Sequence, residues 1–203
     1  MKYAQQFKQS SVVTYLLYMW YVEDLIRAHH CDVDGLQPLL ESQYTPQELP
    51  EAYEWYANLC EMMRAEGVTC GGHLQILRNV IIDLTELHAA LLASTRFPFY
   101  NAAYFSALPL IVELRQKNGC KEEPELETCL GAIYGDFVLR MQHKPISEAT
   151  TQALKTISTF LSLLADYYHK ECRGELDRYK LDEAPHAAAQ PTDESQLENE
   201  QQG

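Results

Sequence analysis

An arginine and two acids near the N-terminus have the spacing of a small anion-binding site. Glu23 and Asp24 stand four and three residues before Arg27, so the three charged groups share one face of a helix. The guanidinium could hold an anionic ligand, and a carboxylate beside it could act as a base. The same spacing also suits an ion pair that neutralises itself where a helix leaves the core, and such structural pairs are common. The structural pair is the favoured interpretation, and the ligand site is the alternative.

Further residues would belong to this site if the fold brings them to Arg27. Trp20 precedes Asp24 by one helical turn, and His73 opens a later apolar segment with one polar face. Such a face is solvated by default. The candidate ligand-binding residues are Trp20, Glu23, Asp24, Arg27, His73, Gln75, Arg78, Asn79 and Asp83. Catalytic residues cannot be assigned, because the chain has no hydrolase, phosphate-loop or dinucleotide motif, and whether it is an enzyme stays open.

The histidines and cysteines lack the spacing of a metal site. The run "HHCD" at 29–32 places its side chains on diverging sides of a helix, although a loop could bring them together. Asp166 and His169 are one turn apart, but a di-iron bundle needs Glu-x-x-His pairs, which the chain does not contain. The six cysteines show neither CxxC nor Cys–His spacing, which favours free thiols. We expect no metal and no cofactor.

Helical periodicity dominates the elements that would position these residues, and no segment alternates like a strand. Apolar residues make up 46% and charged residues 22% of the chain, which is typical of a globular protein. The pattern predicts an all-α protein, a bundle of about six helices joined by short loops. The expected helices span about 9–30, 45–66, 72–94, 98–117, 124–141 and 147–168. The segment around Asp32 to Pro38 is expected to connect the first two and to hold at most a helical turn.

Several residues mark the ends and irregularities of these helices. Thr45 and Glu48 form a capping box, and Pro50 is expected to distort the helix that follows. Gly67 suits the left-handed position that ends that helix. Gly131 and Gly135 lie four apart inside the fifth helix, where each glycine costs about 1 kcal/mol relative to alanine. Close approach of a neighbouring helix is the expected reason, and a ligand on bare backbone is the alternative.

Charge and composition divide the chain into two parts. Residues 1–173 are expected to form the helical bundle domain, and residues 174–203 a disordered acidic tail without enough apolar side chains to pack. The formal net charge is −13, with no basic cluster, which argues against nucleic acid and anionic membrane surfaces. The longest charge-free run, 97–112, is too short and proline-interrupted to span a bilayer. With no cleavage site after the apolar run near the N-terminus, a cytoplasmic location is expected.

Five segments resemble an uncharacterised all-helical bacterial family, a domain of unknown function. They are the segments 15–27, "MMR.EGV" at 62–68, "GHLQI" at 72–76, "LPLIVELR" at 108–115 and "GAIYG" at 131–135. The resemblance covers about residues 1–173 and implies a helical fold without an assigned activity. The favoured function is a non-catalytic helical interaction or scaffold protein, with a homodimer or another protein as partner. The alternative is a bundle that binds or acts on a small anionic metabolite through Arg27 with Glu23 and Asp24.

Overall fold

The computed structural model describes residues 2–119 and 122–181, and every regular element among them is a helix. The eight helices are α1 (Lys2–Ser10), α2 (Val12–Ala28), α3 (Val33–Gln43), α4 (Leu49–Ala65), α5 (Gln75–Ala93), α6 (Pro98–Asn118), α7 (Glu125–Met141) and α8 (Glu148–Cys172). The all-α class is confirmed. The predicted number of about six helices is too low, because α1 and α3 were not expected as separate elements.

The first expected helix is broken at Ser11. The Ser11 backbone is extended, and its hydroxyl accepts a hydrogen bond from the Thr14 amide at 3.4 Å, so that α2 begins anew at Val12. The Val12 amide donates to Nε2 of His169 on α8 at 3.1 Å. A serine side chain that bonds to nearby backbone offers the chain an alternative to a continuous helix. The break therefore results from a local cap together with a contact to α8.

The second unexpected helix, α3, contains Pro38. Asp32 caps its start by accepting from the Asp34 amide at 3.3 Å, and Leu36 and Leu40 on one face are fully buried. An interior proline costs a helix roughly 3 kcal/mol. Burying two leucines contributes about 1.5–3 kcal/mol each, which offsets that cost. The helix therefore forms because its leucines are buried, and the proline alone was a misleading signal.

The two ends of α4 show one prediction that is wrong and one that is confirmed. Glu48 accepts hydrogen bonds from the Thr45 amide at 3.3 Å and from the Thr45 hydroxyl at 2.9 Å, but this turn precedes the helix. Pro50 therefore lies in the first turn, where its missing amide costs little, and it does not distort the helix. At the other end Gly67 is left-handed, with φ of 71°, and the Val68 amide bonds to the Met63 carbonyl at 3.0 Å. This is the expected glycine cap.

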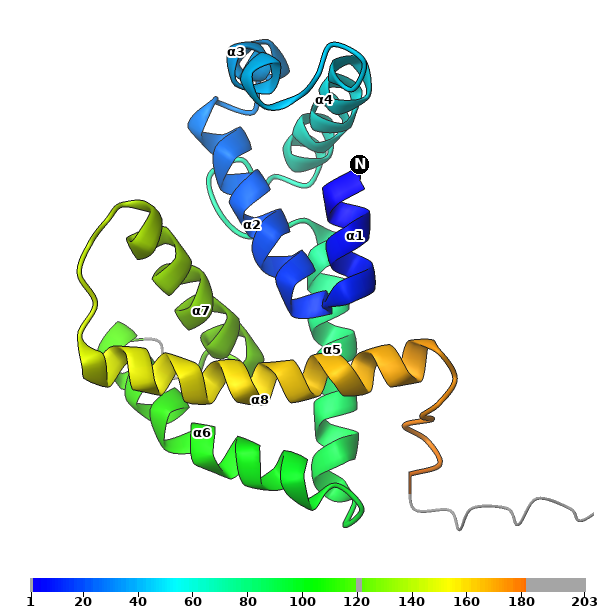
Figure 1. Ribbon diagram of the computed structural model, residues 1–203, viewed down its shortest axis with the longest axis vertical. Helices are drawn as coiled ribbons and strands as arrows, with labels where there is room; N and C mark the ends of the chain where they lie inside the picture. The colour runs from blue at the N-terminus through cyan, green and yellow to red at the C-terminus, as the bar shows by residue number, and fades with distance from the viewer. Residues whose placement is uncertain (1, 120–121, 182–203) are drawn as a thin grey trace, which may run out of the picture.

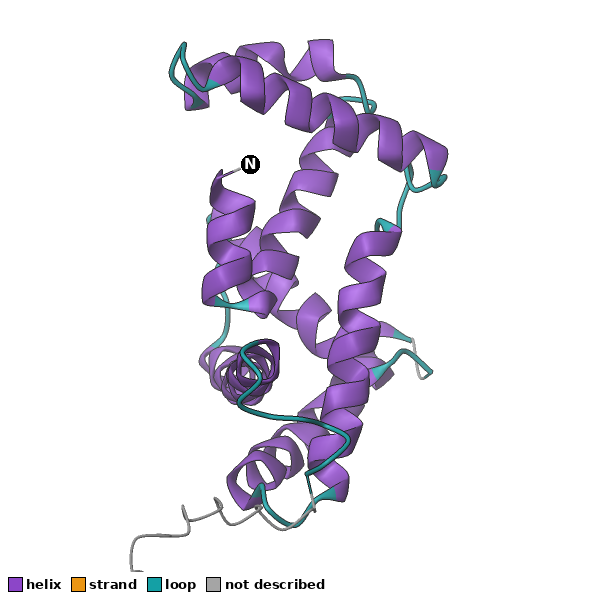
Figure 2. Cartoon of the chain, turned by 90° about the vertical axis from the view of Figure 1, so that its right-hand side faces the viewer, coloured by secondary structure: helices purple, strands orange, loops and turns teal. Residues whose placement is uncertain are grey.

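The long helix α8 crosses α5 and packs against α2, α6 and α7, while α3 and α4 stack together at the far end of the molecule (Figure 1). The arrangement is elongated, and the helices cross at varied angles instead of running side by side (Figure 2). The largest fully buried side chains come from α2 to α6 and from α8, and they include Leu16, Ile26, Leu36, Leu40, Met63, Leu77, Leu84, Tyr100 and Phe160. None of the described helices is long and apolar enough to cross a membrane.

The ordered chain continues past α8 into the segment assigned to the tail from the sequence. Leu181 is buried, and its carbonyl accepts from Nη1 of Arg96 at 2.5 Å. The Arg178 side chain is only 9% exposed and pairs with Asp83 at 2.8 Å and with Glu171. Leu181 and Arg178 therefore contact the helical domain from within the segment that the sequence assigned to the tail. The rest of the predicted disordered tail, 182–203, lies outside the described residues.

The two glycines of α7 do not face another helix. A Cβ atom built on Gly131 or Gly135 would meet no heavy atom within 4 Å beyond its own helical surroundings. The predicted tight helix–helix contact is therefore wrong for this chain. Beyond Leu130 no residue of α7 is fully buried, although Ala132, Ile133 and Tyr134 are partly buried against the core.

Candidate functional site

Glu23 occupies a buried position at the start of α5. Its side chain is 1% exposed, and its Oε1 accepts a hydrogen bond from the amide of Leu74, the residue that precedes the first turn of α5, at 2.8 Å. The neighbouring amide, of Gln75, donates to Oε2 of Glu66 at 2.6 Å. The start of a helix has unpaired amides and a partial positive charge, which favours carboxylates. The two acids therefore cap a helix that lacks a capping side chain of its own.

His73 also contacts the carboxylate of Glu23. Its Nδ1 lies 2.6 Å from Oε2 of Glu23, and its ring stacks on Trp20 with centroids 4.2 Å apart and planes 11° apart. Tyr134 of α7 meets the indole edge-on, with centroids 5.7 Å apart. The buried indole Nε1 has no hydrogen-bond partner among the described residues. Stacking rather than hydrogen bonding thus holds Trp20 in place.

Arg27 is surrounded by acceptors from its own helix and from the loop between α4 and α5. Nη1 donates to Oδ1 of Asp24 at 2.8 Å, and Nε donates to the Val68 carbonyl at 3.2 Å. Nη2 donates to the Gly72 carbonyl and lies 3.8 Å from Oε2 of Glu23. These contacts occupy all three nitrogens of the guanidinium group. Three of its five N–H donors are used in this way, and the group links α2 to the start of α5.

Asp24 completes the cluster by joining α2 to α7. Its Oδ2 accepts a 2.6 Å hydrogen bond from the hydroxyl of Tyr134, and burial together with this carboxylate raises the pKa of Tyr134. The tyrosine therefore stays protonated and acts as a donor at neutral pH. Five candidate residues thus converge as a connected group: Trp20, Glu23, Asp24, Arg27 and His73.

The remaining candidates lie elsewhere. Gln75 donates through Nε2 to Oδ1 of Asn79 at 2.7 Å on an exposed face of α5, and Arg78 is exposed on the same helix. Asp83 pairs with Arg178 in the segment after α8. Because α5 starts at Gln75, His73 lies in the preceding loop. His73 is therefore not in phase with the polar residues of α5, which explains why they do not join the cluster around Arg27.

The two sequences considered for metal binding have structural roles. In "HHCD", His30 and Cys31 adopt left-handed backbone angles, with φ of 57° and 55°, and Asp32 caps α3. His169 uses Nε2 to accept from the Val12 amide, as described above. No group of three or more potential metal ligands is clustered among the residues that the structure describes.

A second polar network, which was not predicted as a unit, lies where α5, α6 and α7 meet. His88 bonds through Nδ1 to the hydroxyl of Tyr100 at 2.6 Å, as expected for a core histidine. Its Nε2 lies 3.9 Å from Glu125, which accepts a 2.9 Å hydrogen bond from Tyr104. Burial lowers the pKa of His88, and Glu125 opposes this only in part. A buried histidine that is hydrogen-bonded to Tyr100 and surrounded by aromatic rings indicates a structural role.

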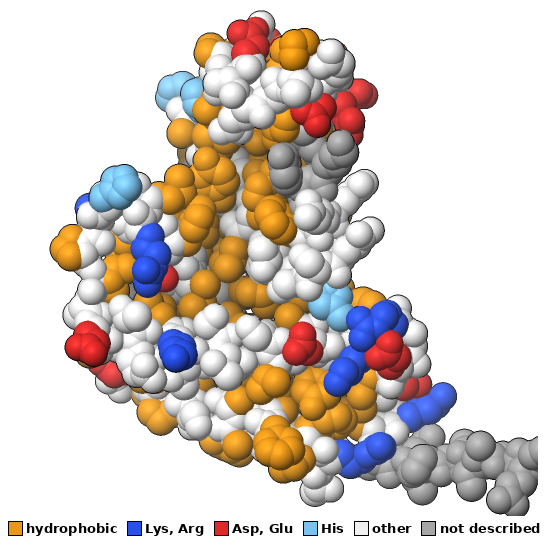
Figure 3. Space-filling view, viewed as in Figure 1, with side chains coloured by type: hydrophobic (Ala, Val, Ile, Leu, Met, Phe, Trp, Pro, Cys, Tyr) orange, Lys and Arg blue, Asp and Glu red, His pale blue; other side chains and the backbone are white. Residues whose placement is uncertain are grey.

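An apolar groove between α2 and α7 is the main feature that the sequence did not reveal. It has a volume of about 370 Å³ and is lined by Phe7, Thr14, Leu17, Tyr18, Tyr21, Ile133, Asp136, Phe137 and Arg140. We call it the α2–α7 groove. Apolar side chains gather in the hollow between the two helices (Figure 3). Asp136 and Arg140 are bonded to each other, with Nε of Arg140 at 3.0 and 2.9 Å from the two carboxylate oxygens. Apart from this ion pair and Thr14, the residues that line the groove are aliphatic or aromatic.

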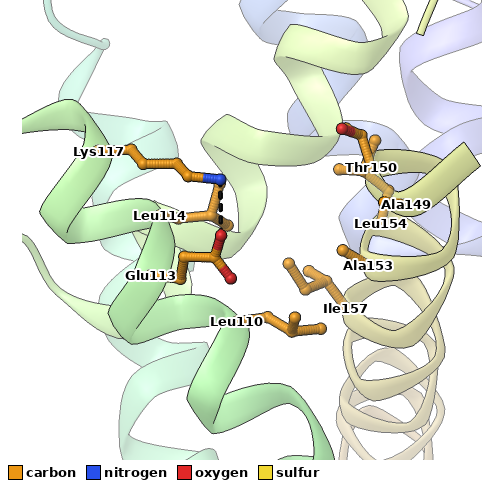
Figure 4. A pocket seen from close by; sticks show the side chains of 9 residues that line it. All are labelled: Leu110, Glu113, Leu114, Lys117, Ala149, Thr150, Ala153, Leu154 and Ile157. Atoms are coloured by element: carbon orange, nitrogen blue, oxygen red, sulfur yellow. Dashed lines mark ion pairs between the residues drawn. The ribbon is translucent and has the colours of Figure 1, made fainter. Parts of the chain in front are cut away.

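A second cavity, of about 320 Å³, lies between α6 and α8 (Figure 4). Its apolar lining includes Leu110, Leu114, Leu154 and Ile157. Glu113 and Lys117 also line it and form an ion pair at 2.6 Å. Neither cavity is lined by a residue of the Arg27 cluster. The polar cluster and the two hollows are thus separate features of the molecule.

Comparison with known proteins agrees with the helical fold. No curated protein and no solved structure matches the chain. Residues 1–175 match the model of a family described as "Domain of unknown function (DUF4924)", which spans α1 to α8. Since the match extends over 175 of the 203 residues, the chain belongs to this family.

Proposed function

We propose that the protein is a non-catalytic interaction protein that binds an apolar helix of a protein partner in the α2–α7 groove. The observation that carries this proposal is the exposure of apolar side chains along the half of α7 that borders the groove. Phe137, Leu139 and Met141 are 40%, 37% and 52% exposed, and they lie on more than one side of the helix. A helix that is apolar on several sides is stable when it is covered on several sides.

The shape of this surface favours a helix over a small molecule. The segment from Gly131 to Met141 has eleven residues, which is about 16 Å of helix at 1.5 Å per residue. The apolar surface thus extends beyond the cavity itself, as expected for a helix-in-groove interface. The charged residues that line the groove are Asp136 and Arg140, whose charges neutralise each other, so a charged metabolite would find no unpaired charge there.

The Arg27 cluster supports the same proposal because its charges are already paired. Arg27 lies 2.8 Å from the carboxylate of Asp24 and 3.8 Å from that of Glu23, and its side chain is 16% exposed, so an anionic metabolite would meet a neutralised and largely covered cation. We therefore assign the cluster a structural role, which is to hold the start of α5 against α2.

Site-specific photo-crosslinking in native cells tests this proposal. A photoreactive phenylalanine analogue replaces Phe137 in the full chain, and the control carries it at Ile82, which is 53% exposed on α5. We expect a discrete protein adduct from position 137 and none from position 82. Thr14→Glu in the same chain should remove the adduct, because it puts a carboxylate into the groove.

Thr14→Glu is a suitable blocking variant because it should leave α2 intact. Position 14 is exposed and lies three residues after the cap Ser11, where glutamate is favoured in a capping box. Equal adduct from positions 137 and 82, or an adduct that persists in Thr14→Glu, would overturn the proposed function.

A further inference from the structure

We infer that the occupant of the α2–α7 groove is α7 of a second copy of this chain, in a twofold arrangement that places Asp136 opposite Arg140 of the other copy. This inference rests on the proposed function and names its partner. In a twofold interface the same surface serves both copies, so it must be complementary to itself. The lining of the groove suits an apolar helix. The second half of α7 exposes apolar side chains to solvent, so α7 of a second copy is such a helix.

The charges at the groove provide the self-complementarity. Asp136 and Arg140 belong to its lining and have opposite charge, one helical turn apart. Residues 136 and 140 are equally distant from residue 138. When two α7 helices lie antiparallel with the twofold axis beside Val138, each Asp136 therefore faces an Arg140 of the other copy.

This arrangement would also bury exposed apolar side chains of α7. Each α7 would lie between α2 and α7 of the other copy, so that four helices surround the axis. Helices α2 and α7 diverge from each other (Figure 1), and the groove between them is open on the face of the molecule drawn in Figure 3. Tyr21 and Phe137 meet edge-on in this groove, with centroids 5.8 Å apart, and would form the floor on which the incoming helix lies.

Complementation between two charge-reversed proteins tests the inference. Asp136→Arg and Arg140→Asp are made separately in the full chain, and masses are measured by light scattering over a wide range of concentration. The wild type should have twice the chain mass of 23.3 kDa, and each variant alone should have the single mass. An equimolar mixture should return to twice the mass, because each contact then joins opposite charges between copies.

The mixture separates an intermolecular contact from the pair within one helix. In both variants residues 136 and 140 of one chain carry like charges, and mixing does not change this. Arg140 is 57% exposed, and a helical ion pair of this kind contributes little to stability. Asp136 is 17% exposed, so a thermal melt of each variant checks that it stays folded. The exposed pair Glu113 and Lys117 on α6 is the matched control (Figure 4), and its reversals should leave the wild-type mass unchanged.

Three results would overturn the inference: a wild type of single mass throughout, a double mass that survives both reversals, or a mixture that stays at single mass. The crosslinking experiment keeps the two proposals apart. A monomeric wild type that forms a groove-specific adduct with a different protein overturns the dimer and leaves the proposed function standing. The absence of both association and adduct overturns both.

Discussion

Glu23 of α2 and Leu74 at the start of α5 are fifty-one residues apart in the chain, and a 2.8 Å hydrogen bond from the Leu74 amide to the Glu23 carboxylate joins them. The carboxylate is buried and also contacts His73 at 2.6 Å. Hydrogen bonds to charged groups contribute roughly 1.5–3 kcal/mol each. Glu23 therefore links α2 to the start of α5.

Replacing Glu23 tests this role. Glu23→Ala should lower the free energy of unfolding by about 3–5 kcal/mol, because both bonds are lost and a buried amide is left unpaired. Glu23→Gln should cost clearly less, since its side-chain oxygen still accepts from Leu74. Urea denaturation of both variants measures the difference. Equal losses for the two substitutions would contradict the capping role.

Arg27 is expected to matter for stability and not for ligand binding. Arg27→Met leaves the buried Glu23 without its nearest cation, which should cost about 3 kcal/mol. The triple variant Glu23→Gln, Asp24→Asn, Arg27→Met should recover much of this loss, because the stranded charge is gone. Thermal melts with and without phosphorylated and carboxylated metabolites check both points. A stable Arg27→Met protein that has lost a metabolite-induced shift would contradict this role.

Stability should fall as the pH drops from about 7 to about 5. Burial lowers the pKa of His88 and of His169 below the ordinary value of 6.5, and Arg173 adds to the effect at His169. The folded state then favours the neutral rings, while the unfolded chain takes up protons once the pH falls below that value. The stabilising contribution is complete above the unfolded pKa and is lost on acidification.

Melting temperatures between pH 5 and pH 8 measure this dependence. Protonated His169 could no longer accept from the Val12 amide, so His169→Gln should flatten the slope relative to the wild type. An unchanged slope in both His169→Gln and His88→Gln would show that other groups govern the acid response.

The C-terminal boundary of the domain can be tested by two truncations. Removing residues 174–203 should lower the melting temperature by roughly 5–10 °C, because the burial of Leu181 contributes about 2–3 kcal/mol. Removing only 182–203 should leave the melting temperature unchanged, given the acidic composition of that segment. Thermal melts of both chains decide the boundary, and an equal effect of the two deletions would contradict it.

The sequence predicted the features that depend on local spacing. Glu23, Asp24 and Arg27 lie on one helix, so their proximity followed from helical geometry alone. The glycine cap at Gly67 was likewise a local signal, and the structure confirms it. The structure also brings Trp20 and His73 to this cluster, and His73 reaches Glu23 from a loop and not from the expected helix.

The features that the sequence missed depend on distant contacts. The break at Ser11 is supported by His169, which is 157 residues from Val12. Helix α3 forms despite Pro38 because its leucines are buried in the fold. Arg178 looked like part of a charged tail because its partner Asp83 lies on another helix. Composition and periodicity are read over short windows, so they do not report such partners.

We propose that the α2–α7 groove binds the partner and that the Arg27 cluster stabilises the fold. The yield of photo-adduct from position 137, compared between Thr14→Glu and the Arg27 triple variant well below their melting temperatures, tests this proposal most directly. We predict that Thr14→Glu loses the adduct at an unchanged melting temperature, and that the triple variant keeps the adduct. Loss of the adduct in the triple variant together with its retention in Thr14→Glu would contradict the proposed roles of the groove and the Arg27 cluster.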